Sequence, residues 1–391
     1  MKQYSNLFFL IIILILAVFM IINPDETVQA SSDGIKLWSL VVVPALLPFF
    51  IVAELLFSLG FVYFLGIVLE PIMQPLFRLP GSSSLVIAMG FTSGFPVGAL
   101  LSRKLYDEKL LTAEETERLA SFTNNSSPLF ILGAVGVGMF GSREIGFLLA
   151  FAHYLSNLIV GILWRFKAVR IIKSRTQSKV NWQLAISLLK DKCRDLSIGG
   201  VLGDAIKNSI NNILAIGGFI LIFSVITRML TVWGFMSFMA QLLMPLLSFF
   251  DISYQGAFGV AMGIFEMTIG TRSIVTAAAP NLPGQLAAVS IILAFSGFSV
   301  IAQIMSIFAG TPIRMSFYIL SRLIQMSLSC LITIFAYKYW LVDKVILSVL
   351  QIEPYRYLYA FDAWTIACYS LLAGLLIIVV LLGWVAFIRY D

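Results

Sequence analysis

Few charged residues interrupt the apolar segments of this chain, and Glu266 and Arg272 stand out among them. Glu266 lies within a long apolar stretch, and Arg272 follows six residues later. A carboxylate buried in lipid is costly unless it is paired. Glu266 is therefore expected to be either a proton- or substrate-linked acid or one half of a structural ion pair with Arg272. Arg272 could instead bind an anionic ligand, because a guanidinium holds a carboxylate through two parallel hydrogen bonds.

Polar residues gather at four interruptions of the apolar segments. The interruptions cover residues 92–98, 123–127, 266–273 and 296–303. Backbone groups freed by a helix break cannot stay unpaired in lipid, so they must face protein or a wet cavity. Breaks at corresponding positions of two halves indicate a transporter site near the middle of the membrane. The residues expected to contact the solute are Thr92, Ser93, Thr123, Asn124, Asn125, Ser126, Glu266, Thr268, Thr271, Arg272, Ser296, Ser299 and Gln303.

Each of these signals also has a purely structural interpretation. Glycine and serine allow helices to approach closely, and one residue of Asn124 to Ser127 could serve as a helix N-cap. His153, on an apolar helix, is more often an interhelical hydrogen-bonding residue than a proton relay. For the four interruptions taken together, we favour the binding site.

An enzymatic interpretation has less support. An intramembrane serine protease of the rhomboid type needs a serine in a G-x-S-G loop and a distant histidine, and Ser93 and His153 provide these residue types. The sequence around Ser93 is GFTSG, however, with one residue too many, and a duplicated second half would stay unexplained. Cys193, Cys330 and Cys368 are too far apart for a metal or redox motif. We therefore expect no enzyme, no catalytic residue, no metal site and no cofactor.

The composition places these residues in a helical membrane protein. Of 391 residues, 60% are hydrophobic and 12% are charged, whereas soluble proteins carry roughly 25% charged residues. Apolar runs long enough to cross a ~30 Å hydrocarbon layer recur along the chain, without the alternating polarity of barrel strands. We expect an all-α polytopic membrane protein with about eight to ten spans plus two hairpins. Thr112 and Glu115 predict a capping box at the start of an amphipathic helix.

Charge patterning divides the chain into five expected regions. The loop 165–194 carries nine of the 26 Lys and Arg residues and is expected in the cytoplasm. Residues 7–22 are either an uncleaved first span, which we favour, or a signal peptide, and an outside loop is expected behind them. The regions are an N-terminal anchor and outside loop (1–34), a first transmembrane repeat (35–165), the basic loop (166–200), a second transmembrane repeat (201–340) and a linker with a C-terminal transmembrane helix (341–391).

The two transmembrane regions echo each other. MQPL at Pro75 parallels LMPL at Pro245, and LSNLI at 155–159 parallels LSRLI at 320–324. The order of helices, broken hairpin and broken helix is the same in each half. We therefore expect two inverted pseudo-repeats, each with a re-entrant helical hairpin and a broken transmembrane helix.

Several segments carry a family resemblance. MGFTSGFPVGALLSRKL (89–105), ERLASFTNNSSPLFILGAVGVGMF (117–140) and FAHYLSNLIVGILWRF (151–166) resemble the YlbJ family of sporulation integral membrane proteins. The second half, with FEMTIGTRS (265–273) and AFSGFSVIAQ (294–303), is similar to the gate, or nucleoside-recognition, domain shared with spore maturation proteins and concentrative nucleoside transporters. The resemblance covers most of the chain.

The resemblance implies a transporter whose two hairpins and two unwound helices form the substrate site. For the YlbJ family it implies movement of dipicolinic acid from the mother cell toward the forespore, across the outer forespore membrane. TSGFP at 92–96 lacks the carboxylate of the nucleoside transporters' hairpin signature, so neither nucleoside specificity nor a sodium site is carried over.

The expected partners are therefore dipicolinate and the lipid bilayer, without nucleic acid, and a homo-oligomer is compatible with the sequence. Dipicolinate is a flat aromatic dianion, which suits half-helix N-termini, Arg272 and phenylalanines such as Phe95. The main alternative is a scaffold subunit of a spore-membrane assembly, in which the breaks serve helix packing.

Overall fold

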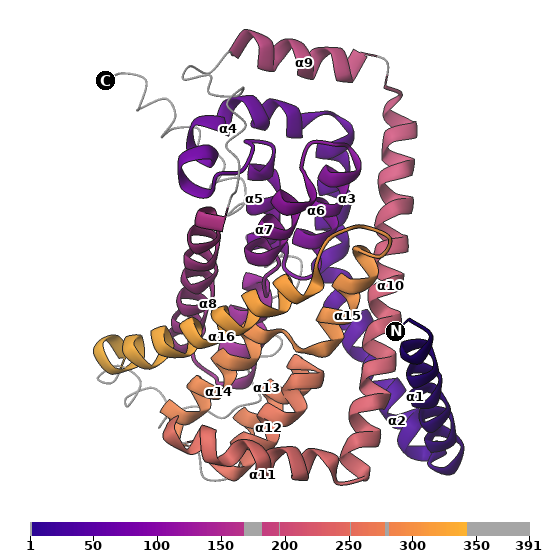
Figure 1. Cartoon of the computed structure of the whole chain (residues 1–391), viewed down its shortest axis with the longest axis vertical. Coiled ribbons are helices and arrows are strands. Elements are labelled where there is room, and N and C mark those ends of the chain that lie inside the picture. The colour runs from indigo at the N-terminus through magenta and orange to yellow at the C-terminus, as the bar shows by residue number, and fades with distance from the viewer. Residues whose placement is uncertain (1, 168–181, 195, 251, 278–280, 342–391) are drawn as a thin grey trace.

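The structure, a computed structural model, describes residues 2–167, 182–194, 196–250, 252–277 and 281–341. Every regular element within these residues is a helix (Figure 1). Part of the basic loop and nearly all of the expected C-terminal region 341–391 lie outside the described residues. The all-helical fold class is confirmed, whereas the boundaries of the expected regions stay predictions.

From residue 43 in the first half and from residue 198 in the second, the order of elements is the same: a helix, a second helix after a turn, a helical pair, a broken helix and a final long helix. The first half contains α1 (Lys2–Ile22), α2 (Pro24–Leu37), η1 (Trp38–Val42), α3 (Val43–Ser58), α4 (Phe61–Phe77), α5 (Ser83–Ser93), α6 (Val97–Asp107), α7 (Ala113–Thr123), η2 (Leu129–Met139), α8 (Arg143–Trp164) and η3 (Arg165–Lys167). The second half contains α9 (Trp182–Arg194), α10 (Ile198–Val232), α11 (Phe235–Leu247), η4 (Ser248–Phe250), α12 (Tyr254–Phe265), α13 (Met267–Val275), α14 (Leu282–Phe295), α15 (Gly297–Ile307), α16 (Met315–Ala336) and η5 (Tyr337–Leu341).

Four helical segments of the described chain are long and apolar enough to cross a membrane, and three bent pairs bring the number of candidate spans to seven. The four are 143–167, 198–232, 282–307 and 315–339. This number is below the eight to ten expected, because several expected spans join into bent pairs and the last one lies outside the described residues. The chain is thus an integral membrane protein with several candidate spans.

The segment 61–77 forms α4, which does not continue the direction of α3. The direction changes by 83° between α3 and α4. Gly60, at φ 78°, allows this turn at the start of α4, and Gly234, at φ 75°, occupies the same place before α11. Figure 1 shows α4 near one end of the molecule and α11 at the other. The two corresponding helices therefore lie at opposite ends of the fold.

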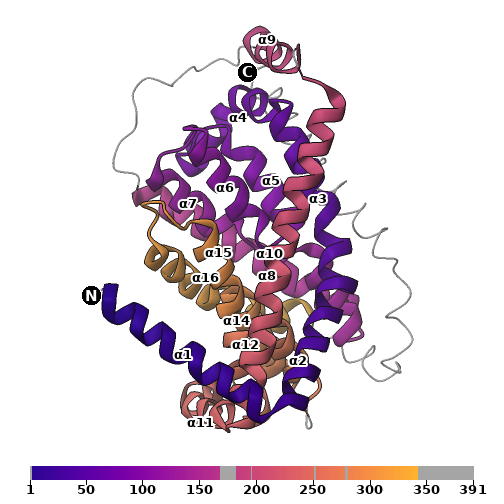
Figure 2. The same ribbon diagram turned by 90° about the vertical axis from the view of Figure 1, so that its right-hand side faces the viewer.

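One correction concerns the outside loop that was expected between residue 22 and residue 34, where the structure has most of α2 instead. Pro24 begins this helix, where its missing N–H costs nothing, and Asp25 and Glu26 stand in the first turn. Glu26 forms an ion pair with Arg228 of α10. Figure 2 shows α10 running along most of the length of the molecule. It packs against α2 and α3, so the N-terminal helices are attached to the second half.

The predicted capping box at the start of α7 is confirmed. The Thr112 hydroxyl accepts a hydrogen bond from the Glu115 N–H at 3.3 Å, and the Glu115 carboxylate accepts one from the Thr112 N–H at 2.8 Å. Two arginines then join this region to the second half. Arg314 binds the buried carboxylate of Glu117 through several N–H groups, and Arg103 donates to the carbonyl of Ile307 at 2.8 Å.

We predict that Gly98→Ala destabilises the protein. A β-carbon at Gly98 would lie 2.4 Å from the carbonyl oxygen of Thr123, so the first hairpin would have to move away from α7, at a cost of about 1–3 kcal/mol. Gly218→Ala is the matched control, since a β-carbon there meets nothing within 4 Å and alanine favours a helix. Thermal unfolding of the purified variants in detergent should show a lower midpoint for Gly98→Ala alone. Equal midpoints would contradict this close packing.

Candidate functional site

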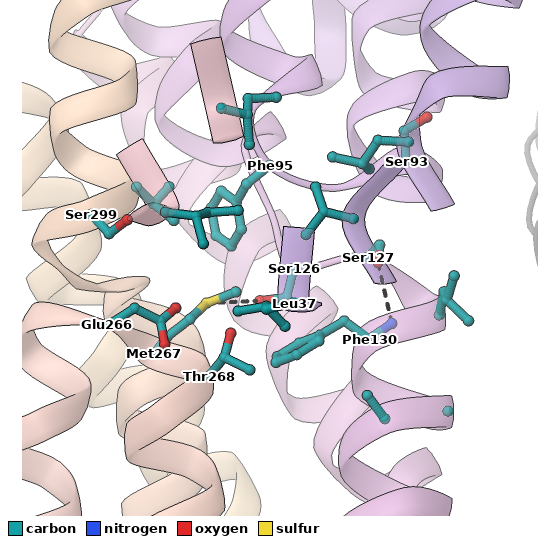
Figure 3. Close-up of a pocket in the computed structure, with 18 of the residues that line it drawn as sticks. Leu37, Ser93, Phe95, Ser126, Ser127, Phe130, Glu266, Met267, Thr268 and Ser299 are labelled. Atoms are coloured by element: carbon teal, nitrogen blue, oxygen red, sulfur yellow. Dashed lines mark hydrogen bonds between the residues drawn. The ribbon is translucent and has the colours of Figure 1, made fainter. Parts of the chain in front are cut away.

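A cavity of about 260 Å³ lies where the helix breaks of the two halves meet (Figure 3). Residues from all four predicted interruptions contribute to its lining. Its polar lining residues are Ser93, Ser126, Ser127, Glu266, Thr268, Ser299 and Gln303. The remaining lining is apolar and comes partly from η1, α3, η2 and α10. The cavity therefore has a polar part at the breaks and an apolar part beside them.

The first helical pair brings Ser93 and Phe95 to the cavity. α5 ends at Ser93, Gly94 takes a φ of 86°, and α6 begins at Val97. α5 and α6 pack against each other as a helical hairpin, and residues 94–96 form the turn between them. Figure 3 shows Phe95 directed into the cavity between Ser93 and Ser299. The N-terminus of α6, at Val97, follows this ring by two residues.

The second helical pair, α12 and α13, brings Glu266 to the opposite side. Glu266 has extended backbone angles between the two helices, and its carboxylate accepts a hydrogen bond from the Ile269 N–H at 2.7 Å. The side chain is thus an N-cap that satisfies one of the free N–H groups of α13 and meets the positive end of its dipole. Arg272, six residues on, is exposed and is not among the described residues that line the cavity.

Side chains of α8 form hydrogen bonds with the backbone at the break of the first broken helix. α7 ends at Thr123, and Asn124 has an extended conformation. The Ser126 N–H donates to Nε2 of His153 at 3.2 Å, and the Ser126 carbonyl accepts from the Tyr154 hydroxyl at 2.9 Å. Both backbone groups of Ser126 are therefore satisfied by side chains. His153 is bonded to Ser126, not to Ser93, so the two groups needed for a serine protease are not paired.

Arg322 of α16 holds the other side of the same break. Its guanidinium is fully buried and donates to the carbonyl of Asn124 at 3.1 Å, to that of Ser121 and to Oδ1 of Asn157 at 3.2 Å. These carbonyls belong to the C-terminal end of α7, where a helix dipole is negative and favours a cation. Asn124 in turn donates to the Tyr318 hydroxyl at 2.9 Å. A cation from the second half thus stabilises a helix end of the first half.

The second broken helix provides Ser299 and Gln303. α14 ends at Phe295, Ser296 takes a left-handed φ of 71°, and α15 begins at Gly297. Ser299 and Gln303 lie one turn apart on α15, so both can face the cavity. The N-terminus of α15 therefore meets those of α6 and α13 around the same space.

The predicted site residues divide into three groups by position. Those that line the cavity are Ser93, Ser126, Glu266, Thr268, Ser299 and Gln303. Those that are buried but do not line the cavity are Thr92, Thr123, Asn124, Asn125, Thr271 and Ser296. Arg272 is exposed. The sequence interpretation did not select Arg322 and Tyr318, although the repeat alignment pairs Arg322 with Asn157, its hydrogen-bond partner in the structure.

The electrostatics of the cavity depend on one carboxylate and several helix ends. Glu266 is the ionisable side chain among the described lining residues, and no lysine or arginine is among them. Positive potential comes instead from the N-termini of α6 and α15, since the carboxylate of Glu266 already caps that of α13. The site can bind a solute with an aromatic or apolar body and a polar edge that accepts hydrogen bonds.

Comparison with known proteins agrees with this architecture. Residues 39–143 and 213–311 match the family described as Gate, nucleoside recognition. The sporulation integral membrane protein YlbJ of Bacillus subtilis is 40% identical over 321 residues, which are 80% of this chain and 78% of that protein. An uncharacterized protein of Alkalihalophilus pseudofirmus is 31% identical over 146 residues, covering 36% of this chain and 30% of that protein. No solved structure matches the chain.

The two matched segments of the nucleoside recognition family fall in the two halves of the fold and include all four helix breaks. The similarity to YlbJ extends over most of both chains. The chain therefore belongs to the family of the sporulation integral membrane protein YlbJ, a family of membrane proteins with a Gate domain that is transporter-like rather than enzymatic.

Proposed function

We propose that the protein carries a small organic anion, dipicolinate, across a membrane by alternating access at the cavity between the four breaks. One observation supports this proposal above the others: residues from both helical pairs and both broken helices line a single cavity. Irregular backbone in a membrane protein is tolerated where it lines a cavity or is covered by protein, and such convergence is typical of transporter sites.

Alternating access needs two structural units that can rock against each other, and we propose that the two halves are inverted repeats of this kind. The equal order of elements, the opposite positions of α4 and α11 and the contact between Asn157 and Arg322 support the proposal. Positions 157 and 322 correspond in the sequence repeat. Residues related by a two-fold axis meet each other only near that axis, so we propose an axis that passes between α8 and α16.

The lining supports an aromatic acid more than a nucleoside. Phe95 and Phe130 offer ring surfaces, and hydroxyl groups with half-helix N-termini offer hydrogen-bond donors to a carboxylate. Glu266 opposes a second negative charge in the same space. We therefore propose that Glu266 is protonated, or is accompanied by a cation, when an anion occupies the cavity. This would make Glu266 the proton- or substrate-linked acid.

The biological setting follows from the relative's name and from the family resemblance. YlbJ is a sporulation integral membrane protein. We propose that this chain acts during sporulation as well, in the outer forespore membrane, and moves dipicolinate from the mother cell toward the forespore. A scaffold subunit whose breaks serve packing is the second candidate, and the packing of Gly98 against Thr123 is the observation that favours it.

Purified protein alone in liposomes should take up radiolabelled dipicolinate faster than empty liposomes do. Imposed proton, sodium and calcium gradients identify the accompanying cation in the same assay. Uptake that requires co-reconstituted spore-membrane partners would support the scaffold instead. Absence of uptake under every gradient, with correctly folded protein in the liposomes, would contradict the transporter.

Glu266→Ala and Asn124→Ala should each lower the initial rate of dipicolinate uptake about tenfold or more. The first removes the carboxylate and the cap of α13, and the second removes the amide that joins the first break to Tyr318; each loss corresponds to roughly 1.5–3 kcal/mol for a buried hydrogen-bonded group. Glu114→Ala, at an exposed position of α7, is the control for loss of a carboxylate. Wild-type rates in both site variants, at equal amounts in the membrane, would rule out the site assignment.

A further inference from the structure

A second set of buried polar groups lies along one face of α16, outside the lining of the cavity. Gln325, Ser329 and Thr333 are at most 1% exposed. The side-chain polar atoms of all three have no hydrogen-bond partner among the described residues, and neither does Nε of Arg322. These are five unpartnered atoms on a single helix. We call Arg322, Gln325, Ser329 and Thr333 the polar file.

The polar file is a continuous stripe that faces the protein interior. Its members are spaced by three, four and four residues, which puts them on one face of an α-helix. α16 packs against α14 and α8, and these contacts cover the file. On the other face, Leu331 and Phe335 are 61% and 65% exposed, as expected for side chains that contact lipid. The file is therefore inside the protein along its whole length.

The file reaches the cavity through His153. Nε2 of His153 accepts the Ser126 N–H, so the neutral imidazole carries its hydrogen on Nδ1. Nδ1 is buried and has no partner among the described residues. His153 and Arg322 hold adjacent parts of the same break, at Ser126 and Asn124. Ser126 itself lines the cavity, so polar groups continue from Thr333 to the cavity wall.

Burial of these polar groups is unfavourable unless each of them has a hydrogen-bond partner. Each buried polar atom without a hydrogen bond costs about 1–3 kcal/mol, and five of them would offset much of the roughly 5–15 kcal/mol by which a protein is stable. Other hydroxyl groups of α16 avoid this cost locally: Ser321 donates to the Phe317 carbonyl at 2.7 Å, and Ser327 to the Leu323 carbonyl at 3.1 Å. Ser329 and Thr333 have no such bond in the structure.

We propose that water molecules occupy the polar file and form a hydrated path from Thr333 to His153, where it joins the cavity at Ser126. Water suits both donors and acceptors, and the file offers both in Gln325, Ser329 and Thr333. The guanidinium of Arg322 stands at the inner end, and a fixed positive charge in a narrow path excludes protons and cations. Apart from this junction, the path is a site for water that lies outside the solute cavity, and it does not depend on the solute's identity.

X-ray hydroxyl-radical footprinting of the full chain in lipid nanodiscs tests this path, because the radicals form from water and oxidise the side chains next to it. His153, 1% exposed, should be oxidised at a rate typical of a hydrated residue. Met236 of α11 is the control, since it is fully buried away from the file and its thioether is readily oxidised. Gln325→Leu combined with Thr333→Val should lower the rate at His153 at least threefold. Ser327→Ala, exposed on the same helix, should leave it unchanged.

Two results would overturn the proposal. His153 could be oxidised as slowly as Met236 in the wild-type protein, or its rate could be the same in the double variant and in Ser327→Ala. If the double variant does not fold, the oxidation rates of His153 and Met236 in the wild-type protein decide the question. Neither measurement involves transport, so the outcome is separate from that of the uptake experiments.

Discussion

The fold depends on one constraint: backbone groups freed by helix breaks inside a membrane must find partners within the protein. Four breaks create many such groups, and the structure satisfies several of them across the boundary between the halves. Arg322 of α16 binds the carbonyls at the break after α7, and Arg103, outside the breaks, binds the carbonyl of Ile307 at the C-terminal end of α15. Each cation meets the negative end of a helix dipole, where it is most stabilising.

The hydrogen bonds that satisfy the backbone groups at the breaks also determine where the cavity lies. The side chains that hold the breaks come from the flanking long helices, as His153 and Tyr154 do from α8. The residues at the four breaks can therefore face one another across the cavity. Glu266, at one of these breaks, caps the half-helix α13. A polar space enclosed in an otherwise apolar molecule is the result. Because its walls belong to both halves, movement of one half against the other would change access to it.

Much of this arrangement could be predicted from the sequence, since polar residues within apolar runs are a strong local signal. TSGFP and FEMTIGTR marked both helical pairs, and the spacing of Thr112 and Glu115 marked the start of α7. The repeat between 155–159 and 320–324 related α8 to α16. Each of these features is carried by a short run of consecutive residues, so it can be recognised in the sequence itself.

Features that depend on distant residues could not be predicted in the same way. Arg272 and Arg322 are both arginines in apolar surroundings, and only tertiary packing makes the first exposed and the second fully buried. The 83° bend before α4 depends on Gly60, and a glycine alone does not distinguish a turn from close packing. α2 carries Asp25, Glu26 and Asp33 and has little overall hydrophobicity, and its packing against α10, far away in the sequence, could not be predicted.

A cryo-electron microscopy structure in nanodiscs with saturating dipicolinate would test the central claim, that the cavity between the four breaks binds the transported solute. We expect density for a flat ligand between Glu266, Ser126 and Ser299, with its ring beside Phe95. Ligand density at another place, or an unchanged cavity without ligand while the protein binds dipicolinate in solution, would contradict it.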